Sequence, residues 1–304
     1  MSNIFAPVTR QKAKLRMALA GVSGSGKTLG ALYIAYGITG DWAKVALIDT
    51  ERERARLYAD RTDLPFPTGA FLYAPLTAPY SPDRYKELVR QAAEAVGPDG
   101  VVIIDSLSHA WNNEGGVLEY KDQIAARPGK NSYTAWAEAG KEQNSLVNSI
   151  LSSPCHTIAT LRVKTEYALE ENERGKKQPV KLGLAPVQRD DMEYEFDIVL
   201  NIGRDHIATA SKDVTFLDRF GQIVTPQLGK QLIGWLEQGI EPEFYICADC
   251  GSRIQDSPRA TAAQRAAATQ EAFGRPLCEA CTKKAVAAKK REEMLQNGSS
   301  QNPA

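Results

Sequence analysis

The sequence lacks an excess of charge of either sign. Over 304 residues, 37 lysine and arginine side chains balance 37 aspartate and glutamate side chains, so no global field draws the protein to nucleic acid or to a membrane surface. No apolar run reaches the length of a membrane span, and residues 1–16 lack the apolar core of a signal peptide. We therefore expect a cytoplasmic protein with no membrane partner, which would bind a polyanion only through a local patch.

Cysteine is also scarce, and four of the five cysteines form two pairs near the C-terminus. Cys247 and Cys250 make one CxxC pair, and Cys278 and Cys281 make the other. In a reducing compartment this pairing favours a metal site over disulfides. Four thiolates complete a tetrahedral Zn²⁺ site with no open position, so the predicted zinc is structural. With a helix predicted over 282–296, the pattern is typical of a treble-clef or ribbon-like module, whereas redox chemistry would place a pair at a strand–helix junction.

Apolar runs alternate with helical stretches along the first part of the chain. Strands are predicted over 15–21, 45–49, 70–74, 101–105 and 157–161, and helices over 27–36 and 81–96. This alternation indicates strand–helix–strand crossovers and a mostly parallel α/β sheet. Beyond about residue 192, the close-spaced strands predicted over 194–201 and 207–211 suit an antiparallel extension, which a helix over 228–238 closes.

The composition changes again near residue 241, where a small module with alanine-rich helical stretches begins. We therefore divide the chain into four parts. These are an N-terminal arm (1–13), an α/β core (14–240), a zinc-binding module (241–296) and a polar tail predicted to be disordered (297–304).

A phosphate-binding motif, Gly-x4-Gly-Lys-Thr, lies between the first predicted strand and the first predicted helix. Its members are Gly21, Val22, Ser23, Gly24, Ser25, Gly26, Lys27 and Thr28. The glycines let the loop wrap a phosphate closely, and the following helix adds its positive N-terminal end. Lys27 then reaches the β- and γ-phosphates of ATP, and the Thr28 hydroxyl takes a position on Mg²⁺.

Acidic residues stand where such a site requires them. Asp105 ends the most apolar predicted strand, which suits a carboxylate on Mg²⁺. Glu51 follows another parallel strand at the edge that faces the ligand crevice, where it could activate the water that attacks the γ-phosphate. Asp49 competes for that role. The alternative for Glu51 is a surface acid paired with its neighbours Arg52 and Arg54.

The phosphate loop, the segment 46–51 and the segment 102–106 resemble, in their order and intervals, the RecA-like ATPase core. The resemblance spans about residues 13–240 and is strongest to the compact phage-encoded ATPases of the Sak type, AAA-family proteins associated with single-strand annealing. In that family the catalytic glutamate follows the strand after the phosphate-loop helix. Because Ser106 rather than an acid follows Asp105, the resemblance implies Glu51.

Further residues receive roles only through this resemblance. Thr160 and Arg162 correspond to sensors of the γ-phosphate. Segment 164–186 corresponds to a mobile DNA-contacting loop, although its acidic residues leave a solvated charged hairpin as the alternative. Lys212 corresponds to a lysine that reaches the neighbouring subunit's nucleotide, against the alternative of an ordinary strand-end lysine. The basic residues of the loop are Arg174, Lys176, Lys177 and Lys181.

The sequence therefore predicts an oligomeric ATPase that acts on single-stranded DNA in phage recombination or replication, by annealing or loading, beside a recombination or replication protein. Only about 14 residues precede the first core strand, which argues for a ring, a short oligomer or an accessory role rather than autonomous strand exchange. Alternatives are a nucleotide-gated interaction module with little turnover and a RecA-type helicase. A small-molecule kinase is disfavoured because no lid-like arginine cluster is present. Whether the zinc module docks on DNA or on protein stays open.

Overall fold

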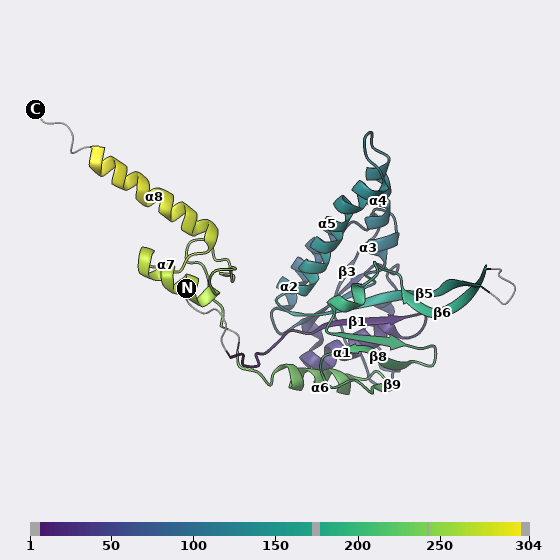
Figure 1. Cartoon of the computed structure of the whole chain (residues 1–304). Coiled ribbons are helices and arrows are strands. Elements are labelled where there is room, and N and C mark those ends of the chain that lie inside the picture. Colours follow the sequence, from purple (N-terminus) through teal and green to yellow (C-terminus); the bar gives the residue numbers. More distant parts are fainter. Residues whose placement is uncertain (1–6, 172–176, 242, 299–304) are drawn as a thin grey trace, which may run out of the picture. The chain divides into compact units, whose positions relative to one another are not determined.

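The computed structural model describes residues 7–171, 177–241 and 243–298. These residues form two compact units (Figure 1). The larger unit spans Ala13–Glu237, and the smaller one combines the described residues up to Lys12 with those from Gln238 onward. Residues 7–12 of the N-terminal arm thus group with the C-terminal part of the chain, where Gln11 forms a parallel bridge with Ile240.

A nine-stranded, mostly parallel sheet forms the centre of the larger unit. Its order is β3-β2-β4-β5-β1-β7-β8-β9, with β6 paired to β5. The contacts among the first six strands of this order are parallel, whereas the β5–β6, β7–β8 and β8–β9 contacts are antiparallel. The strands are β1 (Arg16–Gly21), β2 (Val45–Asp49), β3 (Leu72–Pro75), β4 (Val101–Asp105), β5 (His156–Glu171), β6 (Lys177–Pro186), β7 (Ile198–Ile202), β8 (Ile207–Asp213) and β9 (Gly221–Ile223).

Helices connect these strands and complete the smaller unit. The helices of the larger unit are α1 (Lys27–Thr39), α2 (Pro82–Val96), α3 (His109–Asn112), α4 (Val117–Ala125), α5 (Ser132–Leu151) and α6 (Pro226–Leu236), with short 3-10 turns η1 (Trp42–Lys44), η2 (Arg54–Tyr58) and η3 (Met192–Glu195). The smaller unit holds α7 (Ala262–Phe273) and α8 (Glu279–Gly298). Within the described residues, no helix is both long enough and apolar enough to cross a bilayer.

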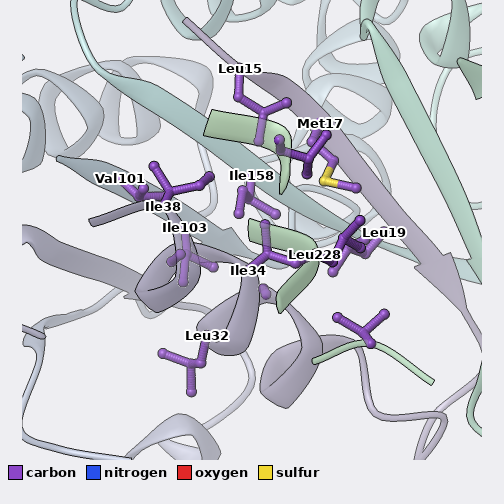
Figure 2. Packing of buried hydrophobic residues seen from close by; sticks show 14 of the residues in the cluster. Leu15, Met17, Leu19, Leu32, Ile34, Ile38, Val101, Ile103, Ile158 and Leu228 are labelled. Atoms are coloured by element: carbon purple, nitrogen blue, oxygen red, sulfur yellow. The ribbon is translucent and has the colours of Figure 1, made fainter. Parts of the chain in front are cut away.

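Strand alternation divides the core into two layers. Met17 and Leu19 of β1 pack with Leu32 and Ile34 of α1 on one face of the sheet (Figure 2). Ala18 and Ala20 of β1, which alternate with them, face α2 and α5 on the other side of the sheet. Because both faces are covered, the parallel strands read as continuous apolar runs rather than as alternating ones. The predicted mostly parallel α/β core is therefore confirmed.

Two strand predictions differ from the structure by more than two residues at one end. The strand predicted over 157–161 continues to Glu171, because β5 pairs with β6 from Val163↔Pro186 onward. The strand predicted from residue 194 begins only at Ile198. Its first two residues instead end η3, in which Met192 and the following Phe196 are buried against the α2–α5 layer.

Candidate nucleotide site and four-cysteine centre

The phosphate loop connects the end of β1 to the start of α1. A Cβ atom added to Gly21 would lie 2.5 Å from Ser25 Oγ and 2.7 Å from the Ile202 carbonyl oxygen, so a larger residue would displace the loop. Gly26 precedes α1 with a φ of 96°, a conformation that other residues rarely adopt. These positions allow the tight wrap that brings main-chain N–H groups and the helix N-terminus toward a phosphate.

Lys27 is the first residue of α1 and lies within this wrap. Its Nζ donates to the carbonyl oxygens of Gly21, at 2.9 Å, and Val22, at 2.8 Å. Burial lowers the pKa of Lys27 below that of a free lysine, and the nearby carboxylates of Asp105 and Glu51 oppose this shift. A phosphate oxygen is a stronger acceptor than a carbonyl, so Lys27 can exchange these bonds for one to a nucleotide.

Two hydroxyl groups converge on the buried carboxylate of Asp105. Thr28 Oγ1 donates to its Oδ2 at 2.6 Å, and Thr160 Oγ1 donates to its Oδ1. Burial raises the pKa of Asp105, and these two hydrogen bonds oppose the shift. Hydroxyl and carboxylate oxygens are the donors that Mg²⁺ prefers, so Thr28 and Asp105 fit a magnesium ion. Thr160, predicted as a γ-phosphate sensor, contacts the carboxylate of Asp105.

Glu51 lies at the same edge of the sheet, paired with Arg162. Arg162 Nε donates to Glu51 Oε1 at 2.6 Å, and Nη2 donates to Oε2. His109 Nε2 lies 3.8 Å from the same Oε1. Burial raises the pKa of Glu51, but the hydrogen bonds and charge of Arg162 outweigh burial and hold that pKa below its ordinary value. The sequence linked both residues to the γ-phosphate but did not predict that they pair.

Asp49, the competing acid, has a different environment. Its Oδ1 accepts the main-chain N–H of Glu51 at 2.6 Å, and its Oδ2 accepts that of Ala55 at 3.0 Å and the Tyr73 hydroxyl at 3.2 Å. Both oxygens are therefore engaged in holding the turn that carries Glu51. This geometry favours Asp49 as the support of the turn and Glu51 as the group that can reach a substrate.

A pocket of about 340 Å³ adjoins the phosphate loop, and the sequence did not reveal it. Its walls are mostly apolar or aromatic, and they come from α1, from the segment after η2 and from the strands β7 and β9. A planar, largely apolar group such as a nucleobase suits such a surface. The side chains that surround the pocket include Leu29, Tyr33, Tyr58, Phe66, Ile202, His206, Ile223 and Val224.

The remaining predicted residues of the larger unit lie outside this cluster or outside the described part of the chain. The Lys212 amine donates to the Tyr194 carbonyl oxygen. Arg174 and Lys176 lie outside the described residues. Lys177 and Lys181 belong to β6, but their side chains are not described. The predicted DNA loop is thus seen as the backbone of a β5–β6 hairpin.

The four paired cysteines converge in the smaller unit. The Sγ atoms of Cys247, Cys250, Cys278 and Cys281 all lie within 4.8 Å of one another, and those of Cys250 and Cys278 are 3.6 Å apart. Tetrahedral zinc with Zn–S bonds of about 2.3 Å requires sulfur atoms about 3.8 Å apart. The four thiols therefore fit a structural zinc site.

Groups around the thiols also suit a metal centre. Main-chain N–H groups, first that of Cys278, lower the pKa of the Cys247 thiol to about 6 and favour the thiolate. Ser252 Oγ lies 3.0 Å from Cys250 Sγ. Arg275 forms a two-point ion pair with Asp249, inside the first CxxC turn, with Nε 2.6 Å from Oδ1. These contacts hold the two cysteine-bearing turns together.

The match to a protein family agrees with this geometry. Residues 13–224, more than half of the chain, match the family described as an AAA domain. No curated protein matches the sequence. One similar solved structure, titled "ATPase Domain of G40P", aligns over 76% of this chain and 86% of its own length, with 13% identity and a TM-score of 0.37.

Proposed function

The chain belongs to the AAA domain family, and from this premise we propose that it is a magnesium-dependent ATPase whose turnover responds to single-stranded DNA. The observation that supports turnover most directly is the convergence of Thr28, Asp105 and Thr160 beside the phosphate loop, with Glu51 at the same sheet edge. Together with Lys27, this arrangement offers a carboxylate for the metal, a lysine for the phosphates and a separate carboxylate that can act as the base.

Each residue has a distinct role in the proposed reaction. Lys27 binds the β- and γ-phosphates, while Thr28 and Asp105 hold Mg²⁺, which neutralises charge on the phosphate oxygens. Glu51 orients the attacking water and accepts its proton. Thr160 keeps the Asp105 carboxylate oriented through its hydroxyl. In this proposal the unit Ala13–Glu237 performs the chemistry.

The Glu51–Arg162 pair suggests how turnover is restrained. While Arg162 holds both oxygens of Glu51, that carboxylate is a weak base. A γ-phosphate competes for the guanidinium, because Arg binds phosphate and carboxylate with the same two-point geometry. Transfer of Arg162 to the phosphate would free Glu51 and place positive charge where the transition state needs it.

Replacing Arg162 with alanine is expected to lower kcat at least about tenfold, with nucleotide affinity within about threefold. The side chain of Arg162 is 47% exposed, and freeing Glu51 from such a pair contributes about 1 kcal/mol or less. A cation at the transferring phosphate raises the rate about 10³-fold or more. The loss of this charge therefore outweighs any gain from freeing Glu51. Steady-state phosphate release measures kcat, and calorimetry measures nucleotide affinity.

The control for this experiment is Arg189→Ala, which removes an exposed guanidinium that donates to Asn144 Oδ1. It should change neither quantity by more than about twofold. Faster turnover in Arg162→Ala than in the wild type would show that Arg162 only restrains Glu51, and would remove its role at the phosphate.

The DNA response is proposed from the position of the β5–β6 hairpin. Arg162 lies on β5 directly before the paired stretch that starts at Val163, so a ligand on the hairpin can move the residue that holds Glu51. We therefore propose that segment 164–186 contacts single-stranded DNA. Binding would then release Glu51 and raise turnover.

The test is the ATPase rate with and without oligo(dT) at low salt. We expect stimulation of several fold, falling with added salt because phosphate contacts release counterions. Substituting Arg174, Lys176, Lys177 and Lys181 together with alanine should lower both the stimulation and the DNA affinity. Lys230→Ala, an exposed lysine on α6, is the matched control. Turnover that is unchanged by DNA would exclude the DNA part of the proposal.

A nucleotide-gated interaction module is the second candidate, and the Arg162–Glu51 pair also supports it. If the pair persists with nucleotide bound, the protein would bind ATP tightly and hydrolyse little. Turnover below one ATP per chain per hour, with or without DNA, would favour this candidate. Unwinding of a forked duplex would favour a RecA-type helicase instead.

We further propose that the protein acts as a homo-oligomer of the Sak type in phage recombination or replication, with an annealing or loading role. Lys212 would then reach the neighbouring subunit's nucleotide. The zinc module would dock on DNA or on a recombination or replication protein. Mass in solution with and without ATP tests the oligomer, and annealing of complementary oligonucleotides tests the role.

A further inference from the structure

His206 links the phosphate loop to the turn between β7 and β8. Its Nδ1 lies 3.0 Å from the Ser25 carbonyl oxygen of the loop, and a Cβ atom added to Gly26 would lie 3.3 Å from the same Nδ1. The turn that carries it is held by bonds from His206 N to the Gly203 carbonyl oxygen, at 3.1 Å, and from Ile207 N to Asp205 Oδ1, at 3.1 Å. The imidazole is therefore fixed against the loop.

This contact determines which ring nitrogen carries the proton. A carbonyl oxygen only accepts hydrogen bonds, so Nδ1 must donate. In the neutral ring, Nε2 is then an acceptor. Among the residues that the structure describes, Nε2 has no hydrogen-bond partner, and the ring forms part of the wall of the pocket beside the phosphate loop.

We propose that His206 Nε2 accepts a hydrogen bond from a ribose hydroxyl of the bound nucleotide, which makes His206 a determinant of sugar specificity. This inference rests on the proposed nucleotide binding. It assigns a sugar contact to a residue that the sequence left without a role.

The position of the ring favours the sugar over the base. Ser25 and Gly26 belong to the loop that would hold the phosphates, and His206 contacts Ser25 and lies beside Gly26, where an added Cβ atom would be 3.3 Å from its Nδ1. The ribose is the part of a nucleotide that directly follows the α-phosphate, so its hydroxyls lie nearest to such a ring. Tyr33 and Phe66, whose rings pack edge to face with centroids 5.5 Å apart, come from other segments of the pocket wall and offer the base an aromatic surface.

Three proteins test the inference: the wild type, His206→Asn and His206→Ala. His206 has a φ of 65°, which asparagine tolerates better than most residues. The asparagine amide nitrogen takes the place of Nδ1 and can keep the bond to the Ser25 carbonyl oxygen, but nothing replaces Nε2. Alanine removes both contacts.

Calorimetry with ADP, 2′-deoxy-ADP, 3′-deoxy-ADP and pyrophosphate measures the result. The wild type should bind ADP about 3- to 10-fold more tightly than one of the deoxy forms, the effect of one hydrogen bond. His206→Asn should bind ADP and that deoxy form equally while its pyrophosphate affinity stays within about twofold. His206→Ala should also lose pyrophosphate affinity, because the loop loses its support. Thermal unfolding confirms that each variant is folded.

Equal binding of ADP and both deoxy forms by the wild type would overturn the inference, as would a preference that persists unchanged in His206→Asn. Binding of inosine diphosphate, whose base lacks the 6-amino group of adenine, distinguishes a contact to the base from a contact to the ribose. If the His206→Asn effect disappears with inosine diphosphate but not with a deoxy sugar, Nε2 contacts the base and the ribose assignment is wrong. Failure of the wild type to bind ADP at all would remove the proposed function itself.

Discussion

Replacing Glu51 with glutamine is expected to lower ATP turnover at least about 100-fold, the usual effect of losing a general base. Glutamine keeps the size of the side chain and one acceptor oxygen, but it cannot take a proton from water. Because Lys27, Thr28 and Asp105 are unchanged, nucleotide affinity should stay within about threefold. Phosphate release under saturating ATP measures turnover, and calorimetry with ATP measures affinity.

The matched control for this variant is Glu53→Gln, two residues along the same turn. Glu53 is exposed and pairs with Arg56 at 3.1 Å, so its loss should change turnover by less than about twofold. Wild-type turnover in Glu51→Gln would contradict the proposed base and return Asp49 to that role. Asp49→Asn would then be the informative variant, although it would also weaken the bonds to Glu51 N and Ala55 N.

Removal of the metal is expected to unfold the smaller unit and leave the larger one folded. The hydrophobic cluster of the smaller unit has five buried residues, and two of them are cysteines of the proposed site. A structural zinc contributes about 10–16 kcal/mol of apparent binding energy in comparable small modules, more than so small a core can replace. Without the zinc, the turns that bear the two CxxC pairs lose the ion that binds them both.

Cys278→Ser tests this expectation in the full-length protein. Metal analysis should find about one zinc per chain in the wild type and none in the variant. Amide hydrogen exchange should become fast over 247–281 and stay unchanged in the strands of the larger unit. Cys155→Ala is the control, because the fifth cysteine is buried in the larger unit and its loss should leave the zinc content intact. Wild-type protein without bound metal would exclude the zinc site.

Several elements could be predicted because their signals are local. The apolar runs that end at Asp49 and Asp105 predicted β2 and β4 at their observed bounds. Ser81, Pro82 and Asp83 predicted the start of α2, which begins at Pro82. The extent of β5 could not be predicted, because from Val163 onward it pairs with β6, the next strand in the chain, whereas the apolar run on which the prediction depended ends at Leu161.

The sequence by itself determined those sites whose residues lie close together in the chain. The loop from Gly21 to Thr28 and each CxxC pair are short segments, so the spacing alone places their groups together. The tertiary structure decided the contacts between distant segments: Glu51 meets Arg162 across 111 positions, and Ser25 meets His206 across 181. A parallel sheet brings the ends of β1, β2, β4, β5 and β7 to one edge. Which side chains touch there depends on strand order and register, and hydrophobic periodicity encodes neither.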